Sequence, residues 1–162
     1  MDEPVWLDRK RVEFIHQQSI EMAGGSQGLR DSGLLDSALA RPRNLHAYGE
    51  KDIFQLAASH AEALSQNHPF VDGNKRAAFV AADTFLFQNG YDLQPSKGDD
   101  HADMIESLAQ SKITREQAAN YLKDCSRARE REKPKKDWSK EPDSNRPLKK
   151  APPINRDRDR SR

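Results

Sequence analysis

The sequence predicts an all-α protein, a compact bundle of about six helices with a small flap, followed by a disordered C-terminal tail. Between residues 1 and 126, apolar residues recur at helical spacing, and short polar loops separate these stretches. The same region nowhere shows the sustained alternation of apolar and polar residues that is typical of strands. With 162 residues, the chain is long enough for one hydrophobic core of ordinary size and too short for two.

The first two helices are each expected to turn one apolar stripe toward the core. The first runs from about Asp8 to Met22 and ends at a pair of glycines. Its inward stripe comprises Val12, Ile15, Ser19 and Met22. The second is capped by Asp31 or Ser32 and stops at Pro42, which has no N–H to donate. The polar stretch from 43 to 51 is long enough to hold a small hairpin or flap.

Four more helices are expected in the rest of the folded region. Asp52 caps the third, which ends near Asn67. The fourth, from Asn74 to about Gln88, is the most apolar in the chain, so we place it at the centre of the bundle. The fifth lies around residues 103 to 109, and the sixth opens with the capping box Thr114-Arg-Glu-Gln117.

Charge is divided unevenly along the chain. Residues 1–126 carry 13 Lys and Arg against 19 Asp and Glu, whereas residues 127–162 carry 14 against 7. The apolar pattern also stops at 127 and prolines recur after it, which predicts a folded domain over 1–126 and a disordered, basic tail over 127–162. The tail could attract nucleic acid, but a solvated extension without a specific ligand is the simpler interpretation.

The composition excludes several classes of protein. No apolar run approaches the roughly 20 residues needed to span a bilayer, and the N-terminus lacks the basic and apolar regions of a signal peptide. Cys125 is the single cysteine, so neither an internal disulfide nor a cysteine-rich zinc site is possible. These features predict a cytoplasmic protein without a membrane partner.

The segment His68–Arg76 contains the residues best suited to chemistry. It places polar and charged side chains immediately before the most apolar helix, which gives them a rigid support. Gly73 allows the backbone to approach a ligand closely. The first N–H groups of the helix, near Gly73, Asn74 and Lys75, form a nest that favours anions. Arg76 adds a guanidinium that can bind phosphate through two donors, so the segment predicts a phosphate site.

His68 and Asp72 would supply the other parts of a transfer reaction. An imidazole can accept a proton near neutral pH, which suits a general base that activates a hydroxyl. The Asp72 carboxylate can hold Mg²⁺, a metal that takes one or two carboxylates and completes its shell with water and substrate phosphates. Phosphoryl or nucleotidyl transfer needs this set of groups. The alternative is structural, with a capped turn at 72–74 and a solvated basic pair at 75–76.

Five further residues with aromatic or imidazole rings are expected to be structural or exposed. Phe70 should anchor the segment His68–Arg76 against the core. The other histidines lie far apart in sequence, without the paired spacing of metal ligands. They are His16, His46, His60 and His101.

The segment His68-Pro-Phe-Val-Asp-Gly-Asn-Lys-Arg76 resembles the active-site motif of the Fic/Doc superfamily, in its death-on-curing version. The stretch from Gly28 to Pro42 is similar to the second-helix region of death-on-curing proteins, and residues 85–91 resemble the end of their central helix. The resemblance covers roughly Val5 to Asp124 and leaves the tail outside. It implies the all-helical Fic/Doc fold, with a catalytic domain over 1–126.

The resemblance also implies a role for the motif residues. His68 would be the general base and Asp72 the Mg²⁺ ligand. Gly73 and Asn74 would donate to the phosphates of the nucleotide, and Arg76 would bind them. The implied cofactors are therefore ATP and Mg²⁺.

Two positions depart from the Fic enzymes that transfer AMP. Those enzymes usually have glycine at the position of Lys75 and a second arginine at the position of Phe79. Both departures match the death-on-curing branch, whose implied activity is transfer of the ATP γ-phosphate to a protein hydroxyl, on elongation factor Tu, with inhibition of translation. The alternatives are AMP transfer to a protein hydroxyl, and an inactive binding or regulatory module.

The death-on-curing branch is usually the toxin half of a toxin–antitoxin pair. Its small antitoxin partner inserts a segment near the active site. No inhibitory motif of the type Ser-x-x-x-Glu followed by Gly or Asn, which self-inhibited Fic proteins use, is evident in this chain. We therefore expect an external antitoxin, with nucleic acid a possible further partner of the antitoxin or of the basic tail.

Overall fold

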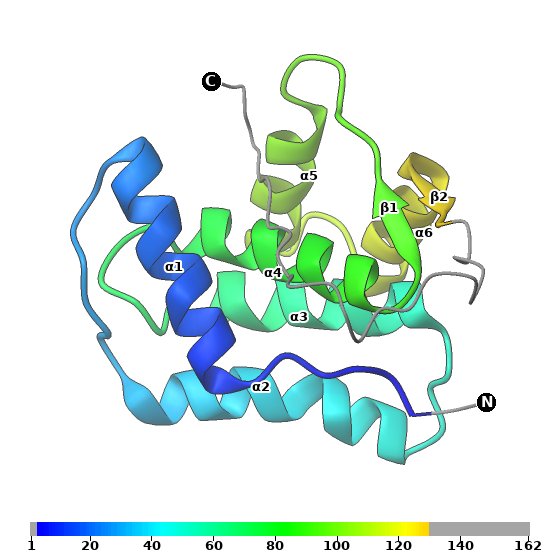
Figure 1. Cartoon of the computed structure of the whole chain (residues 1–162), viewed down its shortest axis with the longest axis horizontal. Helices are drawn as coiled ribbons and strands as arrows, with labels where there is room; N and C mark the ends of the chain where they lie inside the picture. The colour runs from blue at the N-terminus through cyan, green and yellow to red at the C-terminus, as the bar shows by residue number, and fades with distance from the viewer. Residues whose placement is uncertain (1–2, 130–162) are drawn as a thin grey trace, which may run out of the picture. The chain divides into compact units, whose positions relative to one another are not determined.

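The computed structural model describes residues 3–129, and this part of the chain forms six helices and one two-stranded sheet (Figure 1). The prediction of an all-α bundle is confirmed. In chain order the elements are α1 (Arg9–Ala23), α2 (Ser32–Ala47), α3 (Ile53–Asn67), α4 (Asn74–Gln88), β1 (Tyr91–Leu93), α5 (Asp100–Ala109), α6 (Arg115–Cys125) and β2 (Ser126–Ala128).

Side-chain caps set the start of four of the helices. Asp8, Asp31 and Asp52 each accept a hydrogen bond from a backbone N–H in the first turn of α1, α2 and α3. Thr114 opens α6 with both halves of the predicted capping box, the second supplied by Gln117. The sequence therefore predicted these starts correctly, because a cap is a local signal.

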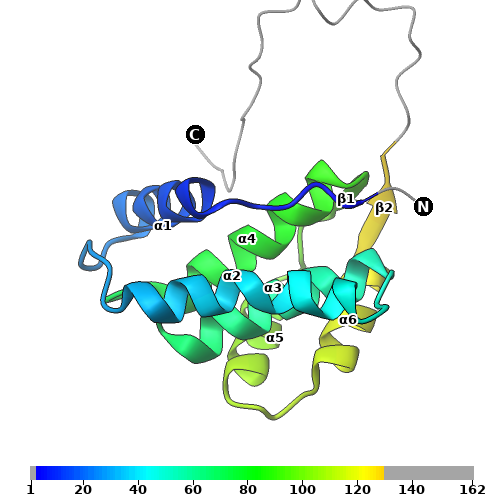
Figure 2. The same cartoon turned by 90° about the horizontal axis from the view of Figure 1, so that it is seen from below.

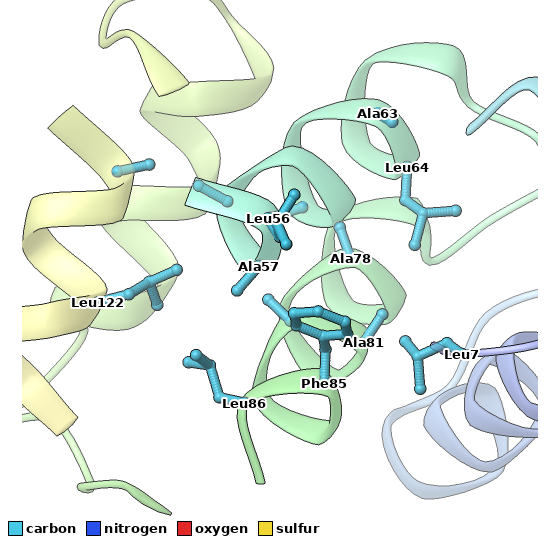
Figure 3. Packing of buried hydrophobic residues seen from close by; sticks show 14 of the residues in the cluster. Leu7, Leu56, Ala57, Ala63, Leu64, Ala78, Ala81, Phe85, Leu86 and Leu122 are labelled. Carbon is cyan, nitrogen blue, oxygen red and sulfur yellow. The ribbon is translucent and has the colours of Figure 1, made fainter. Parts of the chain in front are cut away.

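Helix α3 lies at the centre of the bundle and contacts α2, α4, α5 and α6 (Figures 1 and 2). Both α3 and α4 carry four fully buried alanines, and such small side chains allow neighbouring backbones to approach closely. Phe85 of α4 lies fully buried in the middle of the hydrophobic cluster, with Leu86 and Leu122 nearby (Figure 3). The prediction of α4 as a central helix is consistent with this packing.

Helix α2 is longer than predicted, and the expected flap is wrong. Pro42 lies inside the helix, which continues to Ala47. A proline removes one helical hydrogen bond, but this ring is fully buried against the core, and its packing offsets the loss. Residues 43–47 are therefore helical and leave only a short connection to α3, with no hairpin between them.

A small antiparallel sheet was not predicted. Strand β1 pairs with β2, with Asp92 opposite Arg127, and each strand has three residues, too few for an alternating pattern to be visible. The backbone N–H of Arg129 also donates to the carbonyl of Gly90. Residues 126–129 are thus part of the folded unit, whereas the remainder of the predicted tail, from 130 onward, lies outside the described residues.

Two smaller differences concern helix faces and ends. Met22, expected on the inward stripe of α1, is 69% exposed, and Ile20 and His16 are buried instead. Helix α5 begins at Asp100, three residues before the predicted start. None of the helices between residues 3 and 129 combines the length and the apolar character needed to cross a membrane.

His60 of α3 is a buried histidine without a hydrogen-bond partner. Its ring packs near Trp6 and Phe85, and neither ring nitrogen is paired. Burial, with the charge of Arg43 as a second cause, lowers the pKa of His60 from 6.5 to about 3. The folded protein therefore holds a neutral imidazole at pH values where the unfolded chain binds a proton.

We predict that His60→Leu stabilises the protein and weakens its sensitivity to acid. Below pH 6.5 the imidazole of His60 binds a proton in the unfolded chain but stays neutral in the folded protein. The free energy of unfolding therefore falls by up to about 1.4 kcal/mol for each pH unit, until the folded pKa of about 3 is reached. Urea unfolding at pH 7 and pH 5 should show that the free energy of unfolding falls less between the two pH values in His60→Leu than in the wild type. His101→Leu is the control, since His101 bonds Tyr121 and Gln94 and its removal should destabilise. An unchanged pH slope in His60→Leu would contradict the assignment.

Candidate active site

The predicted motif forms the loop between α3 and α4, so one helix ends and another begins at the site. His68 is the C-cap residue of α3 and adopts a left-handed backbone conformation, with φ 52° and ψ 55°. Asn74 opens α4 and is nearly buried. Its side-chain oxygen accepts from the N–H of Phe70 at 2.9 Å, and its amide donates to the carbonyl of Phe70 at 2.9 Å. The Asn74 side chain therefore shapes the loop, and its backbone N–H remains available for a ligand.

Helix α1 supports the loop from the side. Phe70 is 3% exposed, as predicted for an anchor, and its ring stacks on that of His16 with 3.8 Å between centroids and 6° between planes. The Nε2 atom of His16 lies 2.7 Å from the carbonyl oxygen of Asp72, to which it donates in the matching tautomer. His16 is structural, as expected, but its contact with the motif was not predicted. The burial of its neighbours on α1 indicated a core position, and nothing in the sequence indicated what it faces.

The connection between α1 and α2, residues 24–31, runs beside the motif loop. Leu29 forms an isolated antiparallel bridge with Phe70, and the N–H of Val71 donates to the carbonyl of Gly28 at 3.0 Å. The N–H groups of Arg30 and Asp31 both donate to the carbonyl of Pro69. The motif loop is therefore held by backbone hydrogen bonds from a segment about forty residues earlier in the chain.

The Asp72 carboxylate is exposed but fixed in place. Its Oδ1 accepts from the N–H of Gly73 at 2.9 Å, and its Oδ2 accepts from the N–H of Ser26 at 3.2 Å. An ionised carboxylate has about four lone-pair positions, so both oxygens keep capacity for a metal. Residues 3–129 contain no group of three or more acidic, histidine or cysteine side chains arranged for a metal. A lone carboxylate fits Mg²⁺, which relies on water and phosphate oxygens for its other ligands.

Helix α4 begins without a side-chain cap. Its cap residue is Gly73, in the left-handed conformation with φ 75°, and no side chain bonds the first turn. The first helical hydrogen bond runs from the N–H of Ala77 to the carbonyl of Gly73. The N–H groups of residues 74–76 precede that bond and carry the positive end of the helix dipole. Because Asp72 already takes the N–H of Gly73, the anion nest consists of these three N–H groups rather than of Gly73.

Two basic side chains lie in the same turn. Arg76 is exposed. The ammonium of Lys75 lies 2.8 Å from a carboxylate oxygen of Glu106 on α5, and both side chains are about half exposed, at 48% and 47%. The hydrogen bond and charge of Lys75 hold the pKa of Glu106 below its usual value. An exposed pair of this kind contributes little to stability, so the Lys75 ammonium can exchange Glu106 for phosphate at small cost.

The structure thus gathers all six predicted site residues around one end of α4. His68 is exposed at the start of the loop, and Asp72 is exposed at its end. The sequence missed two residues that hold the loop in shape, His16 on α1 and Arg30 before α2. Together these groups place an exposed imidazole, an exposed carboxylate and an uncapped helix N-terminus on one loop.

Comparison with known proteins agrees with this description. The model of the Fic/DOC family matches residues 6–86. The chain is 41% identical over 114 residues to the protein Toxin Doc of Mycolicibacterium smegmatis, covering 65% of this chain and 84% of that protein. It is 31% identical over 110 residues to Protein kinase doc of Escherichia phage P1, covering 67% and 86%. The chain belongs to the Fic/DOC family, and these relatives place it in the death-on-curing branch.

We predict that Gly73→Ala destabilises the fold by more than its backbone conformation explains. A Cβ at this position would lie 2.8 Å from the Cδ1 atom of Ile20. Left-handed strain costs about 1–2 kcal/mol for alanine, and crowding adds about 1–3 kcal/mol. Gly98→Ala is the control, because Gly98 has φ 61° and nothing within 4 Å of an added Cβ.

Ile20→Val separates the two contributions because it removes the crowding atom. Alone it should cost about 0.5–1.5 kcal/mol, as other buried Ile to Val changes do. In the double variant, Ile20→Val should recover part of the stability that Gly73→Ala removes. Urea unfolding of the two single variants and the double variant measures this as a coupling free energy. Strict additivity of the two changes would contradict the steric explanation.

Proposed function

We propose that this protein is a toxin of the death-on-curing type that transfers the γ-phosphate of ATP to a hydroxyl of a target protein. The observation that carries the proposal is that one loop presents an exposed His68, an exposed Asp72 carboxylate and the uncapped N-terminus of α4. The names of two relatives, a toxin and a protein kinase, support the same activity.

In the proposed reaction, His68 accepts the proton of the attacking hydroxyl as the new P–O bond forms and ADP leaves. The N–H groups of residues 74–76 and the guanidinium of Arg76 donate to phosphate oxygens and stabilise the charge that moves onto the leaving group. Asp72 would hold Mg²⁺, which neutralises phosphate charge when bound. Hydrogen bonds from Ser26 and Gly73 keep the Asp72 carboxylate in one orientation for this role.

Lys75 supports phosphoryl transfer over transfer of AMP. A glycine at this position would leave the first turn of α4 open, whereas the lysine places a mobile ammonium beside it. That ammonium can leave Glu106 and bind phosphate as a point charge. We therefore place the γ-phosphate, rather than the α-phosphate, next to His68.

The proposed target is elongation factor Tu, whose modification would inhibit translation in the cytoplasm. The proposed inhibitor is a small antitoxin, which fits the similarity to a protein named Toxin Doc. An antitoxin that binds nucleic acid would connect the complex to DNA, and the basic segment 127–162 is a second possible contact for nucleic acid.

We predict that elongation factor Tu, incubated with the protein, ATP and Mg²⁺, gains the mass of one phosphoryl group. His68→Ala should slow the modification about 10²- to 10⁴-fold, because a positioned general base is lost. His46→Ala, at the far end of α2, is the control and should remain active. A gain of one adenylyl group by intact mass would establish AMP transfer instead. Normal modification by a folded His68→Ala variant would refute the assignment of the base.

A further inference from the structure

The C-terminal end of α3 has an unusual cap. The last carbonyls of a helix have no partner within it and are often left to water. Here the guanidinium of Arg30, from the connection between α1 and α2, donates from Nε to the carbonyl of His68 at 2.7 Å. It also donates from Nη2 to the carbonyl of Asn67 at 3.1 Å. One side chain thus binds two successive carbonyls at the start of the motif loop.

The backbone between these two carbonyls is strained. His68 and Ser111 are the two non-glycine residues with positive φ between residues 3 and 129. A left-handed conformation is unfavourable for a residue with a Cβ, because the Cβ comes too close to the following carbonyl oxygen. Such a conformation persists only where surrounding contacts enforce it. At His68 the hydrogen bonds to the two backbone carbonyls on either side of its Cα come from Arg30.

The geometry explains how one guanidinium can enforce it. The carbonyl of Asn67 belongs to the peptide plane before the Cα of His68, and the carbonyl of His68 belongs to the plane after it. The angles φ and ψ describe the rotation of these two planes about that Cα. Because the guanidinium is planar and rigid, bonds from it to both carbonyls fix φ and ψ together. The direction of the His68 Cα–Cβ bond, from which the imidazole extends, follows from these two angles.

Arg30 is itself held firmly by its backbone. Its N–H donates to the carbonyl of Pro69 at 2.7 Å, next to the bridge between Leu29 and Phe70. The following residue, Asp31, donates to the same carbonyl and caps α2 through its side chain. The Arg30 side chain is exposed, but the backbone that carries it is held by hydrogen bonds at residues 30 and 31.

We propose that Arg30 is a positioning residue for the reaction, which holds His68 in the left-handed conformation that aims its imidazole at the substrate hydroxyl. This inference rests on the proposed function, because it takes His68 as the base. Misplacement of a reacting group by about 1 Å can cost about 10² in rate. Loss of Arg30 should accordingly lower kcat and leave KM for ATP unchanged, since the hydrogen bonds of its side chain go to the end of α3 and none goes to the first turn of α4.

The test compares Arg30→Met and Arg30→Lys with the control Arg11→Met, which alters an exposed arginine on α1. We expect kcat for target modification to fall about 10²-fold in Arg30→Met and less in Arg30→Lys, which keeps one donor. Free guanidinium at concentrations that do not unfold the protein should restore part of the rate to Arg30→Met. In a His68→Ala background, Arg30→Met should have no further effect.

A second measurement does not depend on activity. The ¹³Cα chemical shift of His68 reports its backbone conformation, and it should leave the left-handed range in Arg30→Met at unchanged overall helicity. A lowered kcat together with this shift supports the inference, and any other combination overturns it. If His68→Ala proves fully active, the proposed function fails, while the chemical shift still shows whether Arg30 holds the backbone of His68.

Discussion

The shape of the motif loop depends on the pair of hydrogen bonds between the Asn74 side chain and the backbone of Phe70. A nearly buried side-chain amide satisfies both the N–H and the carbonyl of Phe70, so breaking it would leave two backbone groups unpaired at about 1–3 kcal/mol each. With Phe70 held, its ring stays stacked on His16, and the carbonyl of Asp72 comes within reach of the same histidine. The pair of hydrogen bonds between Asn74 and Phe70 therefore helps to fix the position of Asp72 at the end of the loop.

The two helix ends at the site are treated in opposite ways. The carbonyls at the end of α3 carry partial negative charge, and the cationic side chain of Arg30 covers them. The N–H groups at the start of α4 carry partial positive charge, and no side chain caps them. Helix α5 also lacks a side-chain cap, whereas α1, α2, α3 and α6 have one. A helix start left open beside the exposed Arg76 can accept an external anion, which is the physical basis for the proposed phosphate-binding site.

The sequence predicted those features that depend on neighbours in the chain. The limits of α3 and α4 follow from a cap at Asp52 and from the apolar content of α4, and the motif is one continuous segment. Features that depend on distant partners were missed. The burial of Pro42 within α2 and the pairing of two three-residue strands are decided by packing. The contacts of His16 and Arg30 with the motif span 56 and 38 residues, and such long-range hydrogen bonds produce no periodic pattern.

The central claim is that the loop binds ATP with the γ-phosphate beside the base, and its most direct test is a crystal structure with Mg²⁺ and a non-hydrolysable ATP analogue. We predict that phosphate oxygens accept hydrogen bonds from the N–H groups of residues 74–76, and that the γ-phosphorus is the phosphorus nearest the imidazole of His68. An α-phosphorus in that place would contradict phosphoryl transfer. A nucleotide bound away from the first turn of α4 would contradict the assignment of the site.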